Sequence, residues 1–322
     1  MSSSKISIII PCYNGKTFLK SSIESVLNQT YKNFVLFLLD NGSTDDSHKV
    51  MLHYKKKDKR VKVIKFKNKT SKAKGVNFAV KKCKTKFISI LDADDLMFRK
   101  KIEIQLKYLK KNPKIDVLGT LCDYININDN KSAGKSAQNL FKHNDCFHLI
   151  DQNRIIAIVA PSVIIKRDIF LKFNGFREEY WPADDADLWT RIAQMGFCVY
   201  ALPEVLLSYR VHKSSITTSN FFLSRLKSLW VKENLILRKK NKKEINYNQF
   251  LSKLNRKSIF FRIKEYLDAL SDHWFRASII QIINKNYIKL VFIFFLSFLS
   301  NPYRLIKKIA YRFFIPNNLK KF

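Results

Sequence analysis

The spacing of apolar and polar residues changes repeatedly along the first third of the chain, and it predicts strands that alternate with helices. Residues 17–29 place apolar side chains at 19, 23, 26 and 27, which is the spacing of one helix face. Short apolar or alternating runs predict strands. The predicted strands are 5–10, 33–39, 61–66 and 87–91, and the predicted helices are 17–29, 45–57, 71–82 and 99–111. This alternation is typical of an α/β protein with a mostly parallel central sheet flanked by helices.

The pattern is less regular after residue 112. Apolar runs at 115–121 and 155–165 are expected to complete the sheet, and the polar segment 126–147 is expected to be a loop or flap. A helical pattern after Asp184 is expected to end at Gly196. We therefore predict a first domain over 1–220, with halves at 1–115 and 116–220. A helical, basic C-terminal region at 221–322 is expected to follow it.

The chain is strongly basic, with 60 Lys and Arg, 26 Asp and Glu and a formal charge of +34. Residues 221–322 carry 22 basic and 5 acidic residues, and residues 1–220 carry 38 and 21, so each part has a net charge of +17. The C-terminal region is therefore the more densely charged of the two. Such a charge calls for an anionic partner, either a nucleic acid or a membrane surface.

The end of the chain favours the membrane surface. Residues 290–303 carry no charge but are fewer than the roughly 20 residues that span a bilayer. In the next segment, apolar and basic residues fall largely on different helix faces; these are Leu305, Ile306, Ile309 and Phe313 against Arg304, Lys307, Lys308 and Arg312. A basic amphipathic helix of this kind suits anionic lipid. The alternative is a helix that packs on the first domain with solvated Lys and Arg side chains.

The glycines and cysteines exclude several kinds of site. The seven glycines form no G-x-G-x-x-G, and a P-loop ending at 134–136 would need glycine at position 129, where Asp stands. Binding of a diphosphate would then require a metal ion. The five cysteines are scattered without C-x-x-C spacing, which predicts neither a zinc site nor disulfides and fits the cytoplasm. The first residues lack the features of a signal peptide.

Acidic residues gather at three places in this basic chain. Asp40 follows one predicted strand, and Asp92, Asp94 and Asp95 follow another. Carboxylates at the carboxyl ends of strands in an open α/β sheet face the ligand crevice. Asp92 and Asp94, two residues apart, suit Mg²⁺ or Mn²⁺ together with substrate phosphates. The alternatives are a helix cap from Asp95 and plain turn chemistry at Asp40.

The third acidic cluster begins a predicted helix. Asp184 as the N-cap with Asp187 three residues later would form a capping box. That account leaves Asp185 unexplained, and a carboxylate held there could act as a general base. Trp181 and Trp189 flank it and could stack on a sugar, although core packing fits them equally well.

Together these segments resemble the inverting family 2 glycosyltransferases with the GT-A fold. The resemblance covers roughly residues 5–215, and the matching segments, in the family's order, are 7–14, 40–47, 91–95, 184–189 and 209–215. It implies that Pro11 and Tyr13 line the nucleotide pocket and that Asp40 contacts the base. It further implies that Asp92, with Ala93, faces the ribose, that Asp94 holds the metal, and that Asp185 is the catalytic base.

Other implied roles are less direct. His212, which taken alone is more often structural, would approach the metal or the diphosphate. The family often has Arg before the residue matched by Asn77, and here Val76 stands there, so Lys72 or Lys74 is expected to supply the cation. Asp184, where the family often has Glu, is expected with Asp187 and the two tryptophans to contact the acceptor.

The resemblance implies metal-dependent transfer of a hexose from a nucleotide-diphosphate donor, expected to be a UDP-sugar, to a hydroxyl of a glycan. Residues 1–115 would bind the donor and 116–220 the acceptor. A lipid-linked glycan of lipopolysaccharide, lipooligosaccharide or capsule synthesis would place the protein peripherally on the inner face of the cell membrane, with no nucleic-acid partner. Two alternatives stay open: a sugar-phosphate nucleotidyltransferase, which would need a loop rich in Gly and Arg, and a basic nucleic-acid-binding protein.

Overall fold

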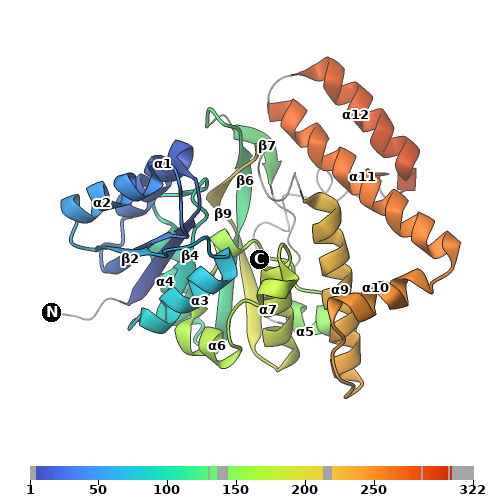
Figure 1. The fold of residues 1–322 in the computed structure, drawn as a ribbon, viewed down its shortest axis with the longest axis horizontal. Helices are drawn as coiled ribbons and strands as arrows, with labels where there is room; N and C mark the ends of the chain where they lie inside the picture. Colours follow the sequence, from blue (N-terminus) through green and yellow to red (C-terminus); the bar gives the residue numbers. More distant parts are fainter. Residues whose placement is uncertain are drawn as a thin grey trace. The chain divides into compact units, whose positions relative to one another are not determined.

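The computed structural model describes residues 5–129, 131–135, 144–212, 220–283, 286–303 and 305–306. The chain divides into two compact units (Figure 1). The first consists of Met1–Cys122 and Gln138–Tyr209, and the second of Asp123–Ala137 and Arg210–Phe322. The division near residue 210 precedes the predicted one at 220, and the short segment after Cys122 joins the second unit.

Four parallel strands make up the first half of the sheet. They are β1 (Ile6–Cys12), β2 (Phe34–Asp40), β3 (Val61–Lys65) and β4 (Phe87–Ile90), in the spatial order β3-β2-β1-β4. Three helices connect them: α1 (Lys16–Leu27), α2 (Ser47–Lys57) and α3 (Lys72–Lys82). Because β1 is central it is buried along its whole length, which explains its continuous apolar sequence.

The second half of the sheet is antiparallel. Its strands are β5 (Leu96–Met97), β6 (Ile115–Ile125), β7 (Lys131–Lys135), β8 (Ile164–Lys166) and β9 (Cys198–Arg210). β8 pairs antiparallel with β4 and β6, and β5 pairs antiparallel with β9. The sheet is therefore mixed, and the predicted parallel arrangement holds for the first half only.

Pro11 lies inside β1, although proline is rare in a central strand. β1 pairs with β2 as far as Cys12, but its pairing with β4 ends at Ile9, two residues before the proline. The missing N–H of Pro11 therefore costs no pairing with β4. The strand runs two residues beyond the predicted end, to the edge where β2 also ends.

The remaining helices of the first unit are α4 (Lys101–Lys111), α5 (Asp145–Asp151), α6 (Arg167–Lys172) and α7 (Asp184–Gln194). Gly196 follows α7 with a φ of 82°, as the predicted helix end requires. The apolar run 155–165 was expected to help complete the sheet, and only its last residues do so, as the start of β8. It holds a 3₁₀ turn (Ala160–Ser162), with Pro161 inside it, before the short β8. The predicted loop over 126–147 contains β7 and the start of α5.

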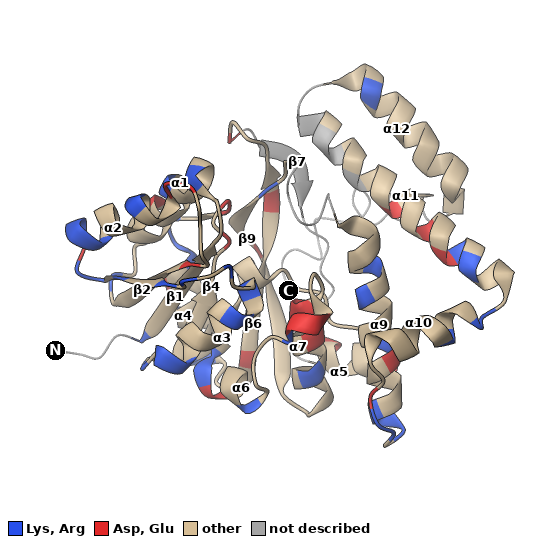
Figure 2. Cartoon of the chain, in the orientation of Figure 1, with Lys and Arg blue, Asp and Glu red and all other residues tan. Residues whose placement is uncertain are grey.

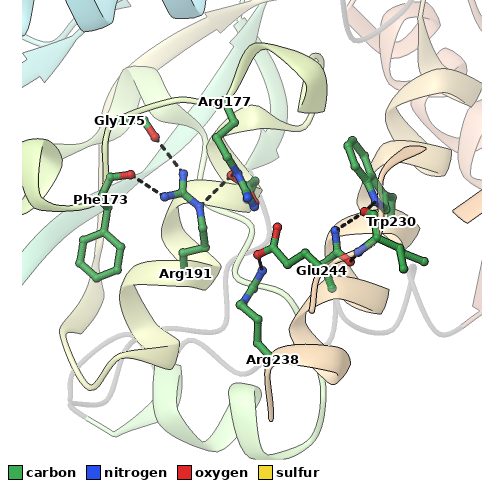
Figure 3. Close-up of polar contacts among 10 residues, drawn as sticks. Phe173, Gly175, Arg177, Arg191, Trp230, Arg238 and Glu244 are labelled. Carbon is green, nitrogen blue, oxygen red and sulfur yellow. Dashed lines mark hydrogen bonds and ion pairs between the residues drawn. The ribbon is translucent and has the colours of Figure 1, made fainter. Parts of the chain in front are cut away.

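The second unit is mainly helical, with α9 (Phe221–Lys239), α10 (Tyr247–Asn255), α11 (Ile259–Ile283) and α12 (Tyr287–Ser300). The turn between α9 and α10 is fixed by side chains of α9. Trp230 donates a hydrogen bond to the carbonyl of Ile245, and Arg238 is paired with Glu244 (Figure 3).

In the described part of the chain, no helix combines the length and the apolar character that crossing a bilayer requires. Most of the amphipathic helix predicted after residue 303 lies outside the described residues, apart from Leu305 and Ile306.

Candidate active site

The carboxyl ends of the parallel strands bring the first two acidic clusters to one edge of the sheet. Cys12 and Asp40 are in register at the ends of β1 and β2. The N–H of Leu91, just after β4, donates to the carbonyl of Ile9 in β1 at 2.9 Å. Asp92 therefore follows at the same edge, where open α/β sheets bind their ligands.

Asp92, Ala93 and Asp94 form a tight turn that α1 holds in place. The N–H of Asp95 donates to the carbonyl of Asp92 at 3.2 Å, and the buried hydroxyl of Ser22 donates to the carbonyl of Ala93 at 2.8 Å. All three turn residues are half-buried. Two carboxylate side chains are thus presented on a supported turn rather than on a mobile loop.

Lys72 brings a positive charge to this turn. Its ammonium group forms an ion pair with the carboxylate of Asp92, and about a quarter of each side chain is exposed. Burial disfavours the charged form of Lys72, but the carboxylates of Asp92, Asp184 and Asp185 outweigh it and raise the pKa of Lys72. Lys74, the other predicted cation, is exposed, and its backbone N–H donates to the hydroxyl of Ser71, the N-cap of α3. The structure therefore places Lys72 in the cluster.

The start of α7 brings the third acidic cluster to the same lysine. In Figure 2 the ribbon at the start of α7 is red, the colour of its acidic residues, which are Asp184, Asp185 and Asp187. Ala183 is the N-cap and makes no side-chain capping bond, so the predicted capping box of Asp184 and Asp187 is wrong. Asp184 is buried, and burial raises its pKa.

Asp185 has the protonation behaviour expected of a general base. Burial, followed by the charge of Asp184, raises the pKa of Asp185 to about 7, against the lowering effects of the N–H of Ala186 and the charge of Lys72. Its Oδ1 accepts the hydrogen bond from that N–H at 2.7 Å. A carboxylate with a pKa near neutrality can accept a proton and release it again at physiological pH.

Asp187 has a structural role that the sequence did not reveal. It is fully buried and lies between two guanidinium groups, paired with Arg177 and with Arg191 Nε at 2.9 Å (Figure 3). Arg191 also donates to the carbonyls of Phe173 and Gly175, at 2.6 and 2.8 Å. Because its carboxylate is enclosed in this way, the predicted acceptor contact of Asp187 is not supported.

The two predicted tryptophans differ in exposure. Trp189 is fully buried, and its Nε1 donates to the carbonyl of Ile158 at 3.0 Å, so core packing is the correct interpretation and stacking on a sugar is not. Trp181 is half-buried, immediately before α7. It stays a candidate acceptor contact.

Asn77 ties α3 to the segment before α7. Its amide donates to the carbonyl of Phe176 at 2.7 Å and accepts from the N–H of the same residue at 3.0 Å. Gly175, with a φ of 64°, approaches so closely that an added Cβ would lie 2.2 Å from Asn77 Oδ1. This double hydrogen bond links the helix that carries Lys72 to the segment that leads into α7.

Asp40 and Tyr13 lie at the β1–β2 end of the site. Asp40 is fully buried, and its Oδ1 accepts a hydrogen bond from the N–H of Ser43 at 2.7 Å. Its Oδ2 lies 3.1 Å from His48 Nδ1, but neither atom makes a hydrogen bond of acceptable geometry among the described residues. Tyr13 is 41 % exposed, with Lys69 Nζ 4.6 Å from the centre of its ring. No pattern in the sequence distinguishes Lys69 from the many other lysines of the chain.

The described residues contain no group of three or more His, Cys, Asp or Glu side chains placed to hold a metal. His212 belongs to the second unit. Mg²⁺ and similar hard cations are commonly bound by one or two carboxylates together with substrate phosphates. The carboxylate oxygens of Asp92 and Asp94 fit a site of this kind, in which the phosphates of the substrate complete the coordination of the metal.

Comparisons with known proteins point to one family of enzymes. The family model described as Glycosyl transferase family 2 matches residues 7–170, which include β1, the turn after β4 and the region of α6. An uncharacterized glycosyltransferase of Methanocaldococcus jannaschii is 30 % identical over 267 residues, 81 % of this chain and 87 % of that protein.

Two further relatives show how the lengths compare. The O-antigen biosynthesis glycosyltransferase WbnJ of Escherichia coli is 31 % identical over 66 % of this chain and 82 % of its own length. An uncharacterized glycosyltransferase of Rickettsia felis is 34 % identical over 59 % of this chain but only 30 % of its own length. Some relatives are thus much longer proteins.

Solved structures support the fold. TarS 1–349 of S. aureus in complex with UDP-GlcNAc matches with a TM-score of 0.59 at 16 % identity, over 95 % of this chain and 91 % of that one. The mannosyltransferase PcManGT of Pyrobaculum calidifontis, in complex with GDP-Man and Mn²⁺, matches with a TM-score of 0.54 at 14 % identity, over 92 % and 86 %. By its sequence this chain belongs to glycosyl transferase family 2, and its mixed α/β fold is that of the GT-A glycosyltransferases.

Proposed function

We propose that this glycosyltransferase moves a hexose from a nucleotide-diphosphate donor, a UDP-sugar, to a hydroxyl of a glycan acceptor, with inversion at the anomeric carbon. The observation that carries the proposal is that Lys72 interacts with acidic residues from two other parts of the fold. The turn after β4 contributes Asp92, the start of α3 contributes the lysine, and the start of α7 contributes Asp185. A phosphate-binding turn and a general base are thereby brought to one cation.

The donor nucleotide is assigned to the end of the site formed by β1 and β2. The unsatisfied Oδ2 of Asp40 is a buried acceptor for an N–H of the base, and the exposed ring of Tyr13 offers a stacking surface. Pro11 shapes the strand end between them. Asp92 and Ala93 then lie where the ribose would follow. Two structural neighbours are in complex with nucleotide-sugars, which supports a donor of this class.

Asp94, with help from Asp92, is assigned to hold Mn²⁺ or Mg²⁺. The bound ion would neutralise the negative charge that develops on the departing diphosphate. Lys72 would face the same charge, in place of the arginine that the family resemblance leads one to expect at Val76. Because Lys72 already pairs with Asp92, donor binding would exchange part of that ion pair for a contact with phosphate.

Asp185 is assigned as the general base. A hydroxyl of the acceptor gives its proton to the Asp185 carboxylate as its oxygen attacks the anomeric carbon. The bond from that carbon to the diphosphate oxygen breaks on the opposite side, so one displacement inverts the configuration. The pKa of about 7 suits this proton transfer. Trp181 and Asp184, next to the base, remain candidate acceptor contacts, whereas no part in the reaction is assigned to His212.

The acceptor is proposed to be a lipid-linked glycan of lipopolysaccharide, lipooligosaccharide or capsule synthesis, reached at the inner face of the cell membrane. The similarity to an O-antigen biosynthesis glycosyltransferase supports this class of acceptor. The charge of +17 on residues 221–322 supports an anionic membrane surface.

The deciding experiment measures nucleotide release from UDP-, GDP-, dTDP- and CMP-sugars, with Mn²⁺, with Mg²⁺ and with EDTA. We expect slow hydrolysis of one donor that requires the metal and is lost in Asp94→Ala. The matched control is Asp58→Ala, an acidic residue paired with Arg60 in the loop after α2. Turnover that EDTA leaves unchanged would overturn the metal assignment, and turnover of no donor would overturn the donor site.

A further inference from the structure

Helix α12 exposes apolar side chains and buries a polar one, the reverse of what is usual for a helix on a water-exposed surface. Five of its apolar side chains are between 56 and 87 % exposed, and we call them the outer stripe: Ile288, Val291, Phe292, Phe295 and Leu299. Their spacing of three and four residues places them along one face of the helix. The residues between Leu290 and Ser300 carry no charge, and in Figure 2 the helix is tan except near its start, where Lys289 lies.

One polar side chain of α12, Ser297, lies on the opposite face of the helix, toward α11. Ser297 is fully buried against α11, where its hydroxyl donates to the carbonyl of Ser271 at 3.0 Å, and the Ser271 side chain is buried as well. Asn301, just beyond the helix, donates to Asp268 of α11 at 2.7 Å. The two antiparallel helices, which lie side by side in Figure 1, are therefore joined by small polar groups. Small polar residues between helices and apolar residues outside are the arrangement that lipid favours.

The length of α12 limits how it could meet a bilayer. Its 14 residues extend about 21 Å, shorter than the hydrocarbon core of about 30 Å. A helix of this size can lie within one leaflet, parallel to the surface. α11 adds exposed apolar side chains at its start, with Phe260 80 % exposed, interspersed with Arg262 and Lys264. Aromatic and basic residues together are typical of the bilayer interface.

The net charge of residues 221–322 favours an anionic bilayer over a second copy of the chain as the partner of this surface. The region that carries the outer stripe has a net charge of +17, so a second copy docked by the same face would bring two strongly positive regions together. A bilayer containing anionic lipid offers negative charge at its surface and hydrocarbon directly beneath it. Such a bilayer therefore matches both the exposed apolar stripe of α12 and the positive charge of the region around it.

We propose that the α11–α12 hairpin is a monotopic membrane anchor that inserts the outer stripe into one leaflet of an anionic bilayer. The anchor combines apolar burial with electrostatic attraction. It depends on helices of the second unit and not on the donor site, so a membrane-binding assay tests it separately from sugar transfer.

The experiment is flotation of the full chain with vesicles of phosphatidylcholine, with and without about one third phosphatidylglycerol, at about 150 mM salt. We expect binding to the anionic vesicles. The double variant Phe292→Ser/Phe295→Ser should bind about a hundredfold more weakly, because burial of each phenylalanine side chain accounts for about tenfold or more. The matched control is Leu52→Ser/Phe78→Ser, two exposed apolar residues of α2 and α3, which should bind like the wild type.

A second readout reports insertion directly. Phe292→Trp should add fluorescence that brominated lipids quench, whereas Phe78→Trp should add none that they quench. Three results would overturn the proposal: equal binding of the wild type and the double variant, a failure of the wild type to float with anionic vesicles, and a dimer in solution that the double variant dissociates while neither protein binds lipid.

Discussion

Lys72 forms an ion pair with Asp92, and the same ammonium group acts on the carboxylates of Asp184 and Asp185 at the start of α7. One lysine thus links the turn assigned to the donor with the residue assigned as the base. Because a cation stabilises ionised carboxylates, Lys72 lowers the proton affinity of Asp185, and it lies beside the turn proposed to bind the phosphates of the donor.

The first prediction concerns the pH dependence of transfer. The pKa of Asp185 is raised to about 7, and a general base works only when deprotonated, so kcat/KM should rise with pH and level off above about 7. Lys72→Met removes a charge that lowers this pKa, so the rising limb should move to higher pH. Lys72→Arg, which keeps the charge, should move it less. The measurement is the pH profile of kcat/KM for the acceptor.

The matched control for this profile is Lys74→Met, on the same helix but exposed and outside the acidic cluster. Its profile should coincide with that of the wild type. A Lys72→Met enzyme that is slower but keeps the midpoint of the wild type would contradict the coupling between Lys72 and the base, and would leave the lysine with a role in donor binding alone.

The second prediction concerns Asp185 itself. Asp185→Asn keeps the size of the side chain but removes the proton acceptor, so kcat should fall by about a thousandfold, within the usual range for a lost general base. Donor binding should change little, because the nucleotide is assigned to the other end of the site. Steady-state transfer and titration with the nucleotide separate the two effects. A variant that retains most of its kcat would disprove the assignment.

Much of the fold was predictable because the N-terminal half follows simple periodicities. The four parallel strands and their helices lie within a few residues of the predicted ranges, since buried strands give apolar runs and amphipathic helices give a repeat of three to four. The antiparallel strands were harder. β8 is three residues long and follows a 3₁₀ turn inside a longer apolar run, and β9 was not predicted.

The part of the candidate site that could be predicted consists of acidic residues that stand out in a strongly basic chain. Acids after buried strands in a basic chain pointed to Asp40, Asp92 and Asp94, and family membership then favoured the glycosyltransferase over the two alternative classes. The spacing of Asp187 also fitted a capping box, but its partners Arg177 and Arg191 meet it only through the tertiary fold. Periodicity could not separate Lys72 from Lys74, because both lie in the first turn of α3 and only the fold decides which one meets Asp92.

The third prediction is a loss of stability in Asp187→Ala. Removing this buried carboxylate leaves Arg177 and Arg191 without their shared anion, and breaking a buried pair in this way costs about 3 kcal/mol of unfolding free energy, or roughly 10 °C in Tm. Asp58→Ala is the control, because its ion pair with Arg60 is partly exposed and should change stability by about 1 kcal/mol or less. Thermal melts of the two variants should therefore differ clearly, and equal melting temperatures would show that Asp187 does not support α7.

The fourth prediction tests the stacking surface for the nucleotide base. Tyr13 and Phe78 are both 41 % exposed, and each has a lysine over its ring, Lys69 at 4.6 Å and Lys82 at 5.5 Å. Only Tyr13 lies at the end of β1, beside Asp40. Tyr13→Ala should weaken nucleotide binding by about 1–3 kcal/mol, the usual contribution of one aromatic stack. Phe78→Ala should have a smaller effect, because its ring on α3 packs edge-on against Phe66 after β3 and does not lie at the end of β1. Calorimetric titration with the nucleotide diphosphate compares the two variants directly.

If both variants bind the nucleotide as the wild type does, the base must lie elsewhere, and the unsatisfied Oδ2 of Asp40 would then need another partner.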